Sequence, residues 1–176
     1  MNEINFSETQ RFKTWWAWAA VGAMNMLFLY AIVQQLVLGK PFGEKPAPDL
    51  VLIVVELFLL ALFIFLVSIK LRTRITENGI YYRFYPFHFS DRIIEWHELS
   101  DAYMREYNSF HEYGGWGIRT GSAKTGNAIN TSASSNKGLQ LRFSDGRLLL
   151  IGTQRPDDVQ EIIEKITAAG KINKGV

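Results

Sequence analysis

The sequence contains no cysteine, which excludes disulfides, thiolate metal sites and a cysteine nucleophile. It also lacks a large excess of either charge, because 19 Lys and Arg residues stand against 17 Asp and Glu residues. The basic residues are dispersed and form no stripe that could follow a phosphate backbone. We therefore expect no nucleic-acid partner, and the absence of cysteine is compatible with a reducing compartment.

Two long apolar runs stand out near the start of the chain, at residues 15–38 and 50–69. As helices, each would span roughly 30–36 Å, enough to cross a bilayer core of about 30 Å. The first run could instead be a cleaved signal peptide. It is, however, longer than a typical signal core, and residues 33–38 contain no small-x-small cleavage site. The sequence thus predicts an uncleaved transmembrane hairpin.

The charges that flank the two runs predict the orientation. Basic residues are more numerous on the side of the termini than in the connecting loop, which carries Lys40 and Lys45. By the positive-inside rule, we expect both termini to be cytoplasmic and the chain to be a multi-pass membrane protein in contact with lipids. Tryptophans at the start of the first run fit the same interface. The predicted membrane-interface residues are Arg11, Lys13, Trp15, Trp16, Trp18, Lys70, Arg72 and Arg74.

A carboxylate within the second run, Glu56, is the costliest residue to place in a bilayer. In an antiparallel hairpin its depth is close to that of Tyr30, Gln34 and Gln35. A protonated Glu56 that is hydrogen-bonded to one of these side chains would satisfy its polar group. The alternative is a role in contacting a partner subunit or in proton movement.

Beyond residue 69 the pattern changes to the two-residue period of β-strands. Residues 71–76 alternate, Glu77-Asn78-Gly79 is typical of a tight turn, and residues 80–85 form the returning strand. Pro86 ends that strand or places it at an edge. Further strands are expected at residues 92–94, 102–107, 139–143 and 147–151.

Residues 114–138 are rich in glycine, serine, threonine and asparagine. Short strands are expected at residues 116–119 and 128–132, and the stretch between them has the composition of a flexible loop. The loop of residues 120–137 is either functional or simply disordered.

The chain is expected to end in a helix over residues 156–169. Its apolar side chains recur at intervals of three and four, which places them on one face. They are Val159, Ile162, Ile163 and Ile166.

About seven antiparallel strands closed by one amphipathic helix form a small sandwich or partly open barrel. The chain resembles small bacterial membrane proteins with two N-terminal helices followed by a bacterial pleckstrin-homology-like (PH-like) domain. The resemblance is carried by residues 74–80 after the second helix, 115–119, 136–141 and 151–156. It implies a PH-like fold and a location in the bacterial inner membrane, and these families are largely uncharacterised. Phosphoinositide recognition is not carried over, because the first turn of the domain holds Glu77 and no base.

Sites for chemistry are weakly indicated. Residues 121–126 superficially suggest a phosphate loop, but Asn127 stands where a lysine is required. No two of the three histidines share a metal-ligand spacing. We therefore expect no cofactor, no metal and no enzymatic activity. Trp116 is either a core side chain or a functional aromatic, and the candidate interaction residues are Trp116, Arg119, Lys124 and Lys137.

The predicted organisation is a cytoplasmic segment (1–14), a hairpin (15–69) and a PH-like domain (70–176). The first functional hypothesis is a scaffold that docks an unidentified protein partner or the membrane surface. The second is an accessory subunit of a membrane enzyme or transporter, engaged through Ala19, Ala23 and Glu56 of the hairpin. Homo-oligomers are compatible with either.

Overall fold

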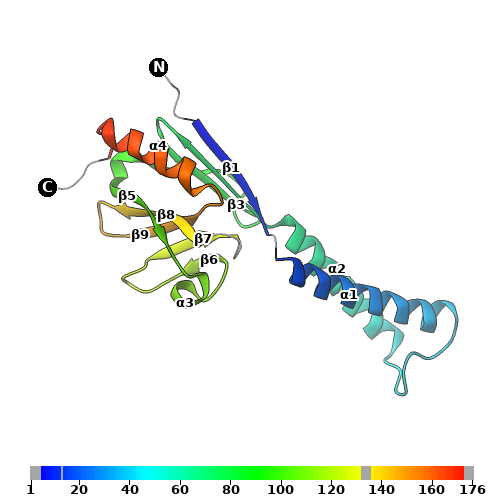
Figure 1. The fold of residues 1–176 in the computed structure, drawn as a ribbon. Helices are drawn as coiled ribbons and strands as arrows, with labels where there is room; N and C mark the ends of the chain where they lie inside the picture. The colour runs from blue at the N-terminus through cyan, green and yellow to red at the C-terminus, as the bar shows by residue number, and fades with distance from the viewer. Residues whose placement is uncertain (1–4, 13, 132–135, 173–176) are drawn as a thin grey trace. The chain divides into compact units, whose positions relative to one another are not determined.

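A computed structural model of the chain describes residues 5–12, 14–131 and 136–172. The chain divides into two compact units, a helical unit and a β unit. The helical unit comprises residues 14–68. The β unit comprises the segment before the helices together with everything from residue 69 onward, so the hairpin is inserted into the chain of the β unit (Figure 1).

The helical unit is an antiparallel pair of helices. Helix α1 (Trp15–Ile32) continues into a π-helical turn (Val33–Val37), and α2 is Asp49–Ser68. The rings of Trp18 and Phe63 meet edge-on at 5.6 Å. Both helices are long and apolar enough to cross a membrane, by length and composition. The two predicted helices are confirmed, with the second shifted by one residue.

The first sheet of the β unit is an antiparallel meander in the order β1-β2-β3-β4. The predicted hairpin forms β2 and β3, and its turn needs glycine. Gly79 has φ +155°, and a Cβ there would clash with the carbonyl oxygen of Ile94. The strands are β1 (Asn5–Arg11), β2 (Lys70–Thr76), β3 (Gly79–Tyr85) and β4 (Arg92–Glu95).

Strand β1 is an element that the sequence analysis did not foresee, since it assigned residues 1–14 only to a cytoplasmic segment. The strand pairs with β2 along its whole length, from Asn5 opposite Thr76 to Arg11 opposite Lys70. Its inward residues are Phe6, Glu8 and Gln10, so two of the three buried positions are polar. The apolar alternation by which a strand is recognised is therefore missing.

The second sheet has the order β5-β8-β9-β7-β6. The neighbours are antiparallel except β7 and β9, which are parallel, so the expectation of a purely antiparallel domain was wrong at this pair. The described residues contain nine strands rather than about seven. A short helix, α3 (Ser109–Tyr113), was also not predicted. The strands are β5 (Leu99–Glu106), β6 (Gly117–Thr120), β7 (Asn127–Asn130), β8 (Lys137–Phe143) and β9 (Leu148–Gly152).

Helix α4 (Pro156–Ala168) completes the β unit and lies beside β5 (Figure 1). Val159, Ile163 and Ile166 are at most 5% exposed, which confirms three positions of the predicted apolar face, and the fourth, Ile162, is half-buried against the same core. They belong to one hydrophobic core with side chains of both sheets, such as Ile75 of β2 and Leu141 of β8. The fold is therefore two sheets packed around a core that one amphipathic helix closes.

Candidate functional site

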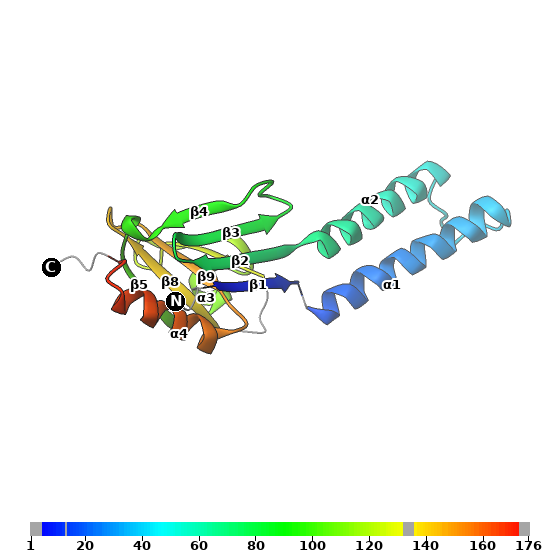
Figure 2. The same ribbon diagram turned by 90° about the horizontal axis from the view of Figure 1, so that it is seen from above.

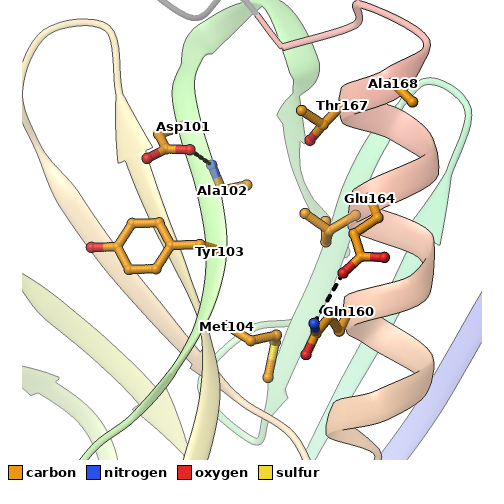
Figure 3. Close-up of a pocket in the computed structure, with 9 residues that line it drawn as sticks. Asp101, Ala102, Tyr103, Met104, Gln160, Glu164, Thr167 and Ala168 are labelled. Atoms are coloured by element: carbon orange, nitrogen blue, oxygen red, sulfur yellow. Dashed lines mark hydrogen bonds between the residues drawn. The ribbon is translucent and has the colours of Figure 1, made fainter.

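A groove of the β unit lies between strand β5 and helix α4. Figure 3 shows Met104 on the strand facing Gln160 and Glu164 on the helix, while Tyr103 points away from the helix. The groove has a volume of about 550 Å³. Residues of β5 lie some sixty positions before those of α4, so folding alone brings the two walls together. The lining residues are Asp101, Ala102, Tyr103, Met104, Gln160, Ile163, Glu164, Thr167 and Ala168.

Strand β5 is an edge strand, and its outer edge faces this groove. Among the described residues, it pairs with β8 and with no second strand. The backbone N–H of Ala102 donates to its neighbour, Asp101 Oδ1, at 2.9 Å and is therefore directed away from β8. Because backbone groups alternate along an antiparallel strand, the N–H and C=O of Met104 are directed to the same outer side. This edge can accept a further strand.

The chemistry of the groove is apolar at its base and acidic at its rim. Ala102 and Ile163 are buried, and Met104 is half-buried beside them. On the rim, Gln160 Nε2 donates to Glu164 Oε1 at 2.9 Å, and Asp101 stands at the opposite wall. Such a site suits an extended peptide with one apolar side chain directed inward and neutral or basic residues beside it.

A smaller cavity of about 220 Å³ adjoins the groove and shares Met104 and Gln160 with it. It extends the free edge of β5 towards Glu106 and Lys137, which face each other across the β5–β8 pair. Lys137 is thus the one candidate interaction residue from the sequence that lies near the groove.

Of the other candidate interaction residues, Arg119 and Lys124 lie on the β6–β7 hairpin and Trp116 directly precedes it. Arg119 Nε donates to the carbonyl oxygen of Trp116 at 2.7 Å, which joins these two. Lys124 is exposed at the tip of the hairpin, in a turn closed by a hydrogen bond from Gly126 N to Ser122 O. Residues 121–126 are therefore a bonded turn, while residues 132–135 of the predicted loop lie outside the described part. The four candidates do not form one site.

Trp116 belongs to an aromatic cluster outside the main core. Its ring is half-buried and meets Phe110 at 4.9 Å and Phe12 at 5.9 Å, in both cases edge-on. Its Nε1 is buried without a hydrogen-bond partner among the described residues. Phe12 directly follows β1, so the cluster lies at the end of the β unit from which the chain continues into α1.

The predicted membrane-interface residues have different surroundings. Arg11 and Lys70 lie opposite each other where β1 ends and β2 begins. Arg72 is exposed, whereas Arg74 forms an ion pair with Asp91 at 2.7 Å. Trp15 and Trp16 are exposed on α1, Trp18 packs against Phe63, and Lys13 lies outside the described residues.

Glu56 is buried in the hairpin, but its expected hydrogen bonds are not there. Gln34 Nε2 donates to Tyr30 Oη, and Gln35 Nε2 donates to Asp49 Oδ1, both at 2.6 Å. Within the described residues, Glu56 Oε2 has no partner, and neither has Asn25 Oδ1. The predicted bond to Gln34, Gln35 or Tyr30 is thus wrong, because those side chains are engaged near the outer end of the hairpin.

A buried polar network, which sequence reasoning missed, ties β1 to the second sheet. Glu8 accepts hydrogen bonds from Thr153 Oγ1 at 2.7 Å and from the backbone N–H of Gln154 at 2.8 Å. Gln10 Nε2 donates to the carbonyl oxygen of Gly152 at 2.6 Å, and Gln10 Oε1 accepts from Thr131. The strand that leads into α1 is thereby fixed to the core of the β unit.

The turn between β3 and β4 is built around His88. The side chain is 8% exposed, its Nδ1 accepts from Phe84 N–H at 3.2 Å, and its own backbone N–H donates to Phe84 O. Burial, followed by the nearby charge of Arg92, lowers the pKa of His88 below 6.5. The folded turn thus holds a neutral imidazole.

This neutral histidine predicts a pH-dependent stability. Below about pH 6.5 the unfolded chain gains a proton that the folded turn resists, so the free energy of unfolding falls as the pH is lowered, by at most about 1.4 kcal/mol per pH unit. Urea unfolding of the full chain in detergent at pH 7.5 and 5.5 measures this. His88→Gln should show the smaller loss between the two pH values, and an equal loss in both proteins would contradict the prediction.

Among the described residues, no three His, Cys, Asp or Glu side chains gather as a metal site would require. Comparison with known proteins shows that residues 2–169 match the model of a family of unknown function, DUF6141. No curated protein and no solved structure matches the chain.

Proposed function

We propose a function from the structure for this chain, which belongs to the DUF6141 family, a family of unknown function. It is a membrane-anchored interaction module of the bacterial inner membrane. The helical hairpin holds the β unit at the cytoplasmic surface, and the β unit docks a protein partner. The exposed apolar side chains of the hairpin support the anchoring role, because Met26, Leu57 and Phe58 are 61–76% exposed and suit a lipid environment.

The observation that carries the docking role is the free edge of β5 beside an apolar groove. An extended segment of the partner adds to β5 through the backbone of Met104 and places an apolar side chain above Ala102 and Ile163. Main-chain hydrogen bonds supply affinity, and the acidic rim selects against acidic segments.

A PH-like assignment is consistent with the order of the elements. Four strands form a meander, β5, β8 and β9 form a second one, and α4 closes the core. On this view, the β6–β7 hairpin and α3 are an insertion between the first two strands of the second sheet. The fold by itself does not specify the partner.

Filling the groove tests the proposal. A photoreactive amino acid at Gln160 should form an adduct with the partner in cells, and the cross-linked peptide should map to one short segment of it. Ala168→Trp places a large ring in the groove, so the adduct should fall about tenfold, as expected when about 1.4 kcal/mol of binding energy is lost. Ala169→Trp is the matched control, because Ala169 is exposed but does not line the groove. An equal adduct in both variants would refute docking in the groove.

A second candidate rests on Glu56, whose Oε2 has no partner among the described residues. In this alternative, the chain is an accessory subunit that binds a membrane enzyme or transporter through the hairpin. Glu56→Gln and Glu56→Leu should then release the partner at unchanged protein level, while Ala168→Trp should retain it. The groove proposal predicts the reverse pattern in the same co-purification.

A further inference from the structure

Two phenylalanines project from the turn between β3 and β4. Phe89 is 88% exposed and Phe87 is 57% exposed, and Tyr85 beside them is 38% exposed. Water-exposed phenylalanines this close together are costly in a soluble domain and mark a contact surface.

The turn lies at the end of the β unit to which the helices are joined. Arg11, Lys70 and Tyr85 lie side by side on β1, β2 and β3, and we call this the attachment end. Figure 2 shows the β3–β4 turn at the same end of the sheet as the tip of β1 and the start of β2. Helix α2 ends at Ser68, and two residues of extended chain cover only about 7 Å. A bilayer crossed by α2 is therefore within reach of this turn.

The turn is fixed in shape, so the phenylalanines are held outward. The His88 side chain points inward, and its Nδ1 accepts a hydrogen bond from Phe84 N–H. The ring of Phe87 stacks on the ring of Phe84, with 5.8 Å between the two centroids. Asp91, at the end of the turn, accepts from Arg74 and Arg83 at 2.7 Å each. Because the turn is already ordered, Phe87 and Phe89 lose little conformational entropy when they leave water for an apolar environment.

The charges around the turn favour an anionic surface. Lys70 lies over the ring of Tyr85 at 5.1 Å, and Arg11, Arg72 and Arg92 are exposed nearby. Arg72 and Arg92 have no ion pair among the described residues, whereas the one acid of the turn, Asp91, is neutralised by two arginines. Basic residues beside apolar side chains are the combination that binds anionic lipid headgroups.

We propose that the turn of residues 85–89 inserts Phe87 and Phe89 into the headgroup region of the anionic membrane that the hairpin crosses. This inference rests on the proposed membrane anchoring and adds a second contact, which fixes the orientation of the β unit on the bilayer. The groove along β5 is then presented at a constant angle to the membrane surface.

Fluorescence quenching in vesicles tests the insertion. The chain has no cysteine, so Ser90→Cys introduces one labelling site beside the intact phenylalanines. The labelled full chain is reconstituted into phosphatidylcholine vesicles containing phosphatidylglycerol and lipids with a nitroxide near the headgroup. The label at position 90 should be quenched at least about twofold more than a label at Asn78, because Asn78 lies at the opposite end of the β2–β3 hairpin, roughly 20 Å along the strand.

Two further variants identify the cause. Phe87→Ser with Phe89→Ser should reduce the quenching at position 90 to the level at position 78, while Tyr103→Ser, which removes an exposed aromatic of β5, should leave it unchanged. A label at Phe58 of α2 reports on the anchor separately, in vesicles whose lipids carry the nitroxide deep in the acyl chains, because Phe58 lies about 15 Å from either end of the helix. If the label at position 58 is quenched but the labels at positions 90 and 78 are quenched equally, insertion of the turn is refuted while anchoring by the hairpin is retained. If position 58 is not quenched, the anchoring fails and the insertion fails with it.

Discussion

Replacing Ile163 by aspartate is expected to unfold the β unit. Ile163 is 5% exposed and lies in the core that joins both sheets to α4. The substitution removes a buried apolar side chain and places a carboxylate there, with a cost of at least about 3 kcal/mol. That is a large part of the 5–15 kcal/mol by which domains are typically stable. Hydrogen exchange of the full chain in detergent should show lost protection in β2 and β8.

Lys165→Asp provides the control on the same helix. Lys165 is exposed, and its side chain has one ion-pair partner among the described residues, Glu161 at 2.6 Å, so its replacement should cost less than about 1 kcal/mol. If Ile163→Asp retained the protection of the parent chain, α4 would not close the core.

Replacing Glu8 by alanine is expected to cause the second large loss of stability in the β unit. Glu8→Ala leaves the hydroxyl of Thr153, the backbone N–H of Gln154 and the amide of Gln10 without their common acceptor. Unsatisfied buried donors cost about 1–3 kcal/mol each, and we expect a total loss of about 2–4 kcal/mol because part of the site can admit water. Exchange protection should fall first in β1, which would come away from the end of β9.

Ser7→Ala is the matched change, because Ser7 lies on the exposed face of the same strand and should alter protection little. Glu8→Gln retains one acceptor oxygen and should give an intermediate loss. Equal protection of β1 in Glu8→Ala and Ser7→Ala would show that the network does not fix the strand.

The elements that could be predicted are those with a strong local pattern. The hairpin helices follow from apolar runs, the β2–β3 hairpin from Glu77-Asn78-Gly79, and α4 from its stripe of Val159, Ile163 and Ile166. Strand β1 was not predicted because its inward face carries the polar residues Glu8 and Gln10. These side chains can be buried because the second sheet supplies their hydrogen-bond partners. Local sequence does not contain that information.

The groove could not be predicted for a related reason. Its walls, Met104 and Gln160, are adjacent only after β5 has paired with β8 and α4 has packed beside it. The outward direction of the Met104 backbone depends on strand register, which a one-residue shift would reverse. The sequence named Trp116, Arg119, Lys124 and Lys137 only as candidate interaction residues. In the structure a hydrogen bond joins Trp116 and Arg119, whereas Lys124 and Lys137 lie apart from them.

We propose that the β unit is carried on a membrane hairpin with both termini cytoplasmic, and cysteine labelling tests this arrangement. Single cysteines replace Pro46, in the loop between the helices, and Ser144, in the exposed turn after β8, in a chain with no other thiol. An impermeant thiol reagent applied to intact bacterial cells should label position 46, and position 144 only after the cells are opened. Labelling of position 144 in intact cells, with none at position 46, would contradict the account.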